Sequence, residues 1–265
     1  MRLASQLASG ILIAFVALLT LDLFVRGAPE WSAGYLFAPV REGGTDGGIG
    51  PIVFSTLFVT FLATAIALPF ALGAAILSNE ILMHSPRLAG AILRSFETLA
   101  SAPSVALGLV GWTLFGRIFG LGFSLLSGGL TLAIMLVPIL AVAFHAGLAA
   151  VPRALRAQSQ ALGVSRWTTL VRLVIPAAWP ALFAGLVLAL GRATAETAVL
   201  MLTSGISTRM PQDAFDPGAT LAVHVYQLAR NVPGGEPRAY AAACALLVIN
   251  VAVHLSLARL RKEPA

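Results

Sequence analysis

The chain alternates between long apolar segments and short polar connections. A membrane-spanning helix needs about 20 apolar residues in succession. Helix is the expected conformation for such segments, because a lone strand in lipid leaves backbone groups without hydrogen-bond partners and the short alternating strands of a barrel are missing here. We therefore predict an all-α membrane protein with six transmembrane helices, at residues 5–25, 52–77, 98–119, 125–147, 178–202 and 239–258.

Several of these segments carry signs of irregular geometry. The second and fifth exceed the length that a bilayer requires, which predicts that they tilt or extend beyond it. Pro69, Pro103 and Pro138 lie within or near spans and predict kinks or local breaks. Small residues crowd residues 62–67 and 241–243, where they let neighbouring helices approach closely.

One polar and basic segment, QALGVSRWTTLVRLVIP at residues 160–176, interrupts the apolar pattern. Its spacing predicts two short amphipathic helices, 154–161 and 166–175, joined at Gly163, because glycine permits a sharp change of direction. Such a hairpin either anchors the bundle at the interface or offers a docking surface to a cytoplasmic partner. The expected apolar face consists of Leu162, Trp167, Leu170, Leu173 and Val174, and the arginines expected to face water or headgroups are Arg153, Arg156, Arg166 and Arg172.

Composition agrees with a membrane location. The 265 residues are 58% hydrophobic and 11% charged, whereas soluble domains average about 45–50% apolar and about 25% charged residues. The length suits one domain with several spans. The apolar stretch at residues 3–25 is expected to be an uncleaved first span, because no small-residue cleavage motif follows it.

The formal net charge of +6 bears on orientation. Basic residues gather on the cytoplasmic side of bacterial membrane proteins, and here they stand singly between spans, which favours a topology signal over nucleic-acid binding. We expect both termini, and with them residues 160–176, to be cytoplasmic. The expected location is the plasma (inner) membrane of a bacterium or archaeon.

Residues for enzymatic chemistry are missing from the sequence. The only lysine is Lys262, so a Walker-type nucleotide loop is excluded, and no G-x-S-x-G motif occurs. Cys244 has no neighbouring histidine to activate it. We predict no catalytic residue, no cofactor and no metal site, because metal-ligand spacing is absent among His84, His145, His224 and His254.

A charged pair lies inside the fifth predicted span. Arg192 and Glu196 are four residues apart and would share one face of a continuous helix. An arginine at the bilayer centre costs about 2.5–3.5 kcal/mol, so such residues face a bundle interior or a water-filled cavity. The pair either fixes helix packing or lines an anion path, in which the guanidinium binds oxyanion oxygens. The hydroxyls that would join this path, or alternatively bond helix to helix, belong to Thr194, Thr197, Ser101 and Ser104.

The pattern Ser159-x-Ala161-Leu162-Gly163-Val164-Ser165-x-Trp167, followed by Val174-Ile175-Pro176, resembles the cytoplasmic "EAA" loop of ABC importer permeases. The resemblance implies that this loop is a coupling helix seated in a groove of an ATPase subunit. The leading glutamate of the family is absent, since Ala157, Gln158 and Ser159 stand at those positions. The residues expected to couple to the ATPase are Ser159, Ala161, Leu162, Gly163, Val164, Ser165, Arg166 and Trp167.

An ordered set of further matches resembles the A-type permease of phosphate-specific ABC importers across residues 47–255. They include GGIGP at 47–51, SAPSVALGL at 101–109 and LALGRATAETAVLMLTSG at 188–205. This resemblance implies a type I ABC importer permease fold, divided into a first helix with its outer loop (1–50), a permease domain (51–258) and a cytoplasmic tail (259–265). The family shares the Arg-x-x-x-Glu pattern, which implies a transport-path role for Arg192 and Glu196.

The same resemblance implies a function and a set of partners. The chain would move inorganic phosphate or a similar oxyanion through the lipid bilayer, together with a homologous C-type permease, a cytoplasmic ATPase dimer and an extracytoplasmic substrate-binding protein. One departure concerns the end of the fourth span, where the family has an arginine and this chain has Val142–Ala146 with His145. The alternatives are a self-contained ion-coupled transporter or channel, and a membrane partner that transports nothing.

Overall fold

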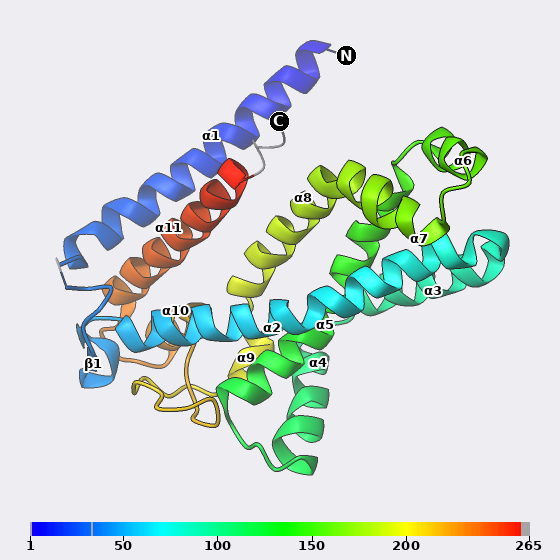
Figure 1. The fold of residues 1–265 in the computed structure, drawn as a ribbon. Helices are drawn as coiled ribbons and strands as arrows, with labels where there is room; N and C mark the ends of the chain where they lie inside the picture. Colours follow the sequence, from blue (N-terminus) through cyan, green and yellow to red (C-terminus); the bar gives the residue numbers. More distant parts are fainter. Residues whose placement is uncertain (1, 33, 261–265) are drawn as a thin grey trace.

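The computed structural model describes residues 2–32 and 34–260 and is built almost wholly of helices (Figure 1). Two-residue strands, β1 (Val40–Arg41) and β2 (Asp46–Gly47), form a small antiparallel hairpin. The helices within these ranges are α1 (Arg2–Gly27), α2 (Gly50–Ile76), α3 (Pro86–Ala100), α4 (Ser104–Gly111), α5 (Leu125–Ala149), α6 (Arg153–Ala161), α7 (Arg166–Thr169), α8 (Ile175–Thr194), α9 (Ala198–Thr203), α10 (Leu221–Arg230) and α11 (Glu236–Leu260).

The described residues contain 5 helices that are long and apolar enough to span a membrane, or 6 spans if one bent pair counts as a span. The all-α architecture with six predicted segments is therefore confirmed. The second span extends as expected, because α2 continues through a π-helical turn (Leu77–Ile81) and a 3-10 turn (Leu82–His84). The straight candidates are Ser9–Glu30, Gly50–His84, Leu125–Ala149, Arg166–Thr194 and Glu236–Ser256.

The third span is not the continuous helix predicted at 98–119. It consists of α3 and of α4 with its π-helical continuation (Trp112–Ile118), which meet at an angle of 94°. Pro103 explains the break, since it has no backbone N–H to donate and its ψ of 128° is extended. Pro69 and Pro138 lie inside α2 and α5, which continue through them.

The fifth span also differs from the predicted range 178–202. The helix begins at Arg166, passes through α7 and a π-helical turn (Leu170–Val174) into α8, and stops at Thr194. Residues 195–197 form a break before the short α9. The second half of the polar hairpin is thus the start of the spanning helix itself.

The core lies between α2 and α5, which cross near the centre of the molecule (Figure 1). Val59, Ala63 and Ala67 of α2 are fully buried, as are Leu132 and Leu136 of α5. The alanines on α2 let the α5 leucines pack directly against its backbone, as the small-residue pattern predicted. The α2–α5 pair forms the centre of the bundle.

A second group of contacts fastens the outer segments to α11. Arg238 donates to the backbone oxygen of Gly47 at 3.1 Å, pairs with Glu30 at 2.8 Å, and lies 5.6 Å from the ring centre of Tyr35. Helices α1 and α11 run side by side in opposite directions, and the start of α1 extends past the end of α11 (Figure 1). The β hairpin lies near one end of α2, and the polar hairpin of α6 and α7 lies near the other (Figure 1).

Candidate functional site

The polar hairpin adopts the predicted helix–turn–helix geometry. Gly163 has a φ of +73°, in the left-handed region that favours glycine, and provides the turn between α6 and α7. Ser165 caps α7, where its hydroxyl accepts a hydrogen bond from the backbone N–H of Thr168 at 3.1 Å. The hydroxyls of Ser159 and Thr169 are 2.6 Å apart and tie the two helices together. The hairpin is therefore a preformed unit that projects from the bundle (Figure 1).

The expected apolar face of the hairpin divides into two parts. Leu170 and Val174 are buried as predicted, 6% and 0% exposed. Leu162, Trp167 and Leu173 are exposed instead, Leu162 by 82% and Trp167 by 69%. Leu162 lies beside the turn at Gly163, whereas Trp167 lines an open pocket between the hairpin and the end of α2. Of the predicted coupling residues, Ser159 is buried and Val164 is half-buried, and the exposed ones are Ala161, Leu162, Gly163, Ser165, Arg166 and Trp167.

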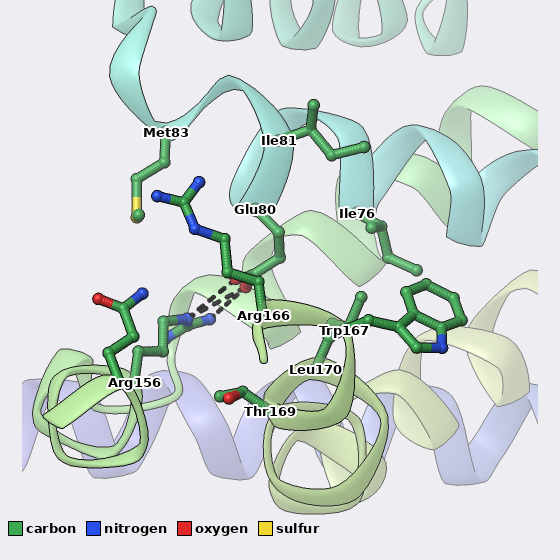
Figure 2. Close-up of a pocket in the computed structure, with 10 residues that line it drawn as sticks. Ile76, Glu80, Ile81, Met83, Arg156, Arg166, Trp167, Thr169 and Leu170 are labelled. Atoms are coloured by element: carbon green, nitrogen blue, oxygen red, sulfur yellow. Dashed lines mark hydrogen bonds and ion pairs between the residues drawn. The ribbon is translucent and has the colours of Figure 1, made fainter. Parts of the chain in front are cut away.

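A pocket of about 320 Å³ separates the hairpin from the end of α2 (Figure 2). Apolar side chains from the α2 extension form one wall, and polar and aromatic side chains from the hairpin form the other. His84, at the end of the extension, lies 3.5 Å from the Arg166 guanidinium. The lining residues are Ile76, Glu80, Ile81, Met83, Arg156, Gln160, Arg166, Trp167, Thr169 and Leu170.

Arg156 does not face water or headgroups as predicted. Its guanidinium forms an ion pair with Glu80, 2.6 Å between Nη2 and Oε1, and the two side chains remain only 12% and 17% exposed (Figure 2). Sequence reasoning missed Glu80. The available signal was its isolation, since no other acidic residue stands between Asp46 and Glu97.

Arg192 and Glu196 contact each other, but not across one helix face. Arg192 lies in the last turn of α8, whereas Glu196 lies in the break before α9. Their closest charged atoms are 3.8 Å apart, beyond hydrogen-bond distance, and the side chains are 53% and 8% exposed. The arginine therefore keeps most of its donors free, next to a buried carboxylate.

The predicted hydroxyl groups occupy different surroundings. Thr194 is buried, and its hydroxyl donates to Asn250 Oδ1 of α11 at 2.7 Å, which is a helix–helix hydrogen bond. Ser101 is exposed at the α3–α4 break and donates to the backbone oxygen of Thr98. Ser104 begins α4, and Thr197 precedes α9; both are half-buried.

The helices that follow the two breaks, α4 and α9, pack against each other. A Cβ on Gly108 of α4 would lie 3.1 Å from the Cα of Val199. Val105 and Thr197 line one open hollow of about 740 Å³, and Tyr226 and Arg230 of α10 line it too. Sequence reasoning did not single out these two α10 residues, because α10 is separated from α9 by a long loop.

His145 of α5 makes polar contacts with the π-helical extension of α2. The Asn79 amide nitrogen donates to the backbone oxygen of His145 at 3.1 Å, which orients the amide, and the same nitrogen is 2.8 Å from His145 Nδ1. The Ser78 hydroxyl is also 2.8 Å from Nδ1. His145 therefore joins α5 to the π-helical extension of α2 through these polar contacts.

Metal chemistry has no candidate site in the described part of the chain. Across residues 2–32 and 34–260, no three His, Cys, Asp or Glu side chains are grouped to hold an ion. The arrangement consists of a projecting hairpin, a charged pair, and an open hollow that Thr197, next to Glu196 in the chain, helps to line.

Comparison with known families places these features in context. The family described as "Binding-protein-dependent transport system inner membrane component" matches residues 67–263. The match includes the polar hairpin, the charged pair and the hollow.

Individual relatives cover most of the chain. "Probable ABC transporter permease protein YqgI" of Bacillus subtilis is 29% identical over 97% of this chain and 95% of its own length. "Probable ABC transporter permease protein YqgH" from the same organism is 33% identical over 66% of this chain and 58% of its own length. "Phosphate transport system permease protein PstA 1" of Mycobacterium tuberculosis is 29% identical over 81% of this chain and 70% of its own length.

Solved structures share the fold at low sequence identity. A subunit of a bacterial alginate ABC transporter, in complex with its periplasmic protein, superposes with a TM-score of 0.67 at 15% identity, covering 98% of this chain and 92% of that one. A chain of the inward-facing MetNI methionine ABC transporter gives 0.63 at 16% identity, covering 81% and 93%. These similarities confirm the ABC importer permease fold.

Proposed function

The chain belongs to the inner membrane component family of binding-protein-dependent transport systems, and we propose that it carries inorganic phosphate or a similar oxyanion. It is a multi-pass inner-membrane protein and the permease subunit of an ABC importer, whose ATP hydrolysis takes place on a separate subunit. Family membership thus disfavours both alternatives, a self-contained ion-coupled transporter or channel and a non-transporting partner.

The observation that carries the oxyanion proposal is the state of Arg192. Its guanidinium is half-exposed and only loosely paired, at 3.8 Å, with a buried carboxylate. A planar cation of this kind suits oxyanion oxygens. Glu196 keeps the cation oriented and limits the affinity for the anion, and a transport path must release what it binds. The similarity to a phosphate permease supports phosphate as the first substrate to test.

The transport path, in this proposal, runs along the face that carries the two helix breaks. The hollow shared by Val105, Thr197, Tyr226 and Arg230 is open to one side, as expected for half of a path that a second permease completes. That subunit would be the homologous C-type permease, and the match to YqgH is consistent with a paired relative. The path residues are Arg192, Glu196, Thr197, Ser101 and Ser104, and Thr194 holds the end of α8 against α11.

In this proposal, the polar hairpin couples the ATPase to the permease. The exposed Leu162 and Trp167 at its tip provide apolar contacts for one protomer of a cytoplasmic ATPase dimer. Closure of that dimer on ATP moves the hairpin, and α7 passes the movement into α8 because the helix is continuous from Arg166 to Thr194. Arg192 stands at the far end of that helix. An extracytoplasmic binding protein delivers the anion on the other side of the membrane.

The test is ATP-dependent uptake of labelled phosphate into proteoliposomes. They contain this chain with its ATPase and second permease, and the binding protein is added outside, with arsenate, sulfate or molybdate as competitors. Uptake that arsenate alone inhibits would support phosphate. An assembled complex that hydrolyses ATP in response to its binding protein, yet takes up none of these anions, would overturn the oxyanion proposal.

Arg192→Ala tests the path directly. A hydrogen bond to a charged group contributes about 1.5–3 kcal/mol, so we expect uptake to fall about tenfold to 100-fold while the complex still assembles. Arg26→Ala is the matched control, because Arg26 is also 53% exposed and paired at i, i+4, but lies on α1. Equal uptake by Arg192→Ala and Arg26→Ala would remove Arg192 from the path.

A further inference from the structure

We propose that Glu80 and Arg156 are positioning residues, which transmit movement of the polar hairpin to α2 and α5. The inference rests on the proposed function in one respect: it takes the hairpin as the contact with the ATPase. Continuity of α7 with α8 explains how the fifth span follows the hairpin. It does not explain how the α2–α5 core follows, since that core belongs to different helices.

The Arg156 guanidinium joins three elements at once. Its Nε and Nη2 donate to the Glu80 carboxylate at the end of α2, at distances from 2.6 to 3.2 Å. Nη2 also donates to the backbone oxygen of Leu148 in α5 at 3.0 Å, and Nη1 donates to that of Val151 at 2.8 Å. The side chain itself belongs to α6. All three guanidinium nitrogens therefore donate hydrogen bonds: Nε to Glu80, Nη1 to Val151, and Nη2 to both Glu80 and Leu148.

The carbonyl contacts place a cation at the C-terminal end of α5. The last carbonyls of a helix have no partner within it, and they carry the negative end of its dipole. Arg156 satisfies these acceptors, and Glu80 balances its charge. The arrangement thus depends on a planar, multi-donor cation and an acid in these positions, and lysine offers only a compact point charge.

Burial distinguishes this pair, which joins two separate elements, from the exposed ion pair within α1. Glu80 and Arg156 are 17% and 12% exposed, whereas the Asp22–Arg26 pair on α1 is about half exposed on both sides. Exposed pairs contribute little, but removal of one partner from a buried pair has a large effect because it leaves the other charge uncompensated.

Among the described residues, this pair is the close and shielded polar connection between the hairpin and the α2 extension, whereas the contact of Arg166 with His84 is exposed and 3.5 Å long. The pocket of about 320 Å³ lies beside it, with Ile81 and Met83 on one wall and Trp167 on the other (Figure 2). Side chains across an open pocket transmit little force compared with directly bonded ones. A displacement of α6 therefore reaches α2 chiefly through the Glu80 carboxylate.

The experiment measures how strongly the substrate-loaded binding protein stimulates ATP hydrolysis by the assembled complex. In Glu80→Ala we expect basal hydrolysis and ATPase co-purification to persist, while stimulation falls by about tenfold. Arg156→Lys, which keeps the charge but loses the planar fork, is expected to behave in the same way. Asp22→Ala is the matched control and should be stimulated like the wild type. Normal stimulation in both Glu80→Ala and Arg156→Lys would overturn the proposal.

A rescue experiment separates transmission from a merely structural role. Cys244 is the only cysteine of the chain, so Cys244→Ala provides a cysteine-free background. In this background, Glu80→Cys combined with Arg156→Cys should be poorly stimulated, and a short bis-maleimide that joins the two thiols should restore stimulation. Failure of the cross-link to restore stimulation in an assembled complex would contradict a mechanical link.

The readout is independent of the substrate. A wild-type complex that is stimulated by its binding protein but takes up no phosphate would overturn the proposed substrate alone. Loss of stimulation in Glu80→Ala would still support the link. Conversely, normal phosphate uptake with full stimulation of Glu80→Ala would support the proposed function and overturn the link.

Discussion

Arginines in this chain differ in role according to what surrounds each guanidinium. Arg156 has its nitrogens engaged by a carboxylate and two carbonyl oxygens, whereas Arg192 has one long contact and an exposed face. The first is suited to hold helices together, and the second to exchange ligands. From residue type alone, Arg156 was predicted to face water or headgroups like Arg153 and Arg166. Its buried environment instead depends on Glu80, which lies 76 residues away in the chain.

His224 provides a residue-scale prediction about pH. It is 2% exposed in α10, and burial lowers its pKa from 6.5 to about 4. Between pH 6.5 and about pH 4, His224 binds a proton in the unfolded chain but not in the folded chain. The free energy of unfolding therefore has its full value above pH 6.5 and decreases as the pH falls toward 4. The loss amounts to about 3 kcal/mol at most. His224→Gln should flatten this part of the profile in thermal unfolding of the purified protein, and an unchanged acid slope would contradict this account.

Helix breaks are the feature that distinguishes the elements of this bundle. The third span bends by 94° at Pro103, and the fifth stops at Thr194. Proline in the sequence indicated the first break, but Pro69 and Pro138 carry the same signal and lie within continuous helices. The second break contains no proline. Local sequence therefore marked candidate positions for breaks, but it did not distinguish Pro103 from Pro69 and Pro138.

Two glycines test how closely these elements approach. A Cβ on Gly111 of α4 would collide with the Thr131 side chain of α5, so Gly111→Ala should lower the free energy of unfolding by about 1–3 kcal/mol. Gly73 of α2 has nothing within 4 Å, and Gly73→Ala should leave it unchanged or raise it by about 0.5–1 kcal/mol. Thermal denaturation of both variants checks the contrast. Equal effects would mean that α4 and α5 are not in close contact.

At the scale of the whole molecule, the hairpin and the outer loops lie at opposite ends of the bundle (Figure 1). Helices α1 and α11 run in opposite directions, so the start of α1 and the end of α11 point toward the same side of the molecule, which agrees with both termini being on one side (Figure 1). The positive-inside argument predicts that this side is the cytoplasm. Two exposed residues mark the ends: Leu162 on the hairpin, 82% exposed, and Phe215 in the loop before α10, 60% exposed.

Labelling with a membrane-impermeant maleimide tests this orientation. In the Cys244→Ala background, Phe215→Cys should react in intact spheroplasts, and Leu162→Cys should react only after permeabilisation. Both side chains are exposed, so a difference in reactivity reports the side of the membrane rather than burial. The reverse pattern would invert the topology and place the hairpin outside.

The sequence by itself determined the membrane class, the helical architecture, the positions of the spans to within a few residues for most of them, and the helix–turn–helix at Gly163. These follow from local properties: runs of apolar residues long enough for a bilayer, and a glycine where φ is positive. The family resemblance of the hairpin also depends on local spacing, and the family match confirms it.

Only the tertiary structure decided which polar groups meet. The Glu80–Arg156 pair, the Thr194–Asn250 hydrogen bond and the shared hollow of Thr197 with Arg230 each join positions far apart in the chain or on separate helices. The physical reason is that a charge or hydroxyl in a membrane bundle is placed by the partner it finds, and that partner is set by how helices cross. Periodicity describes one helix at a time, so it locates such groups without identifying what they contact.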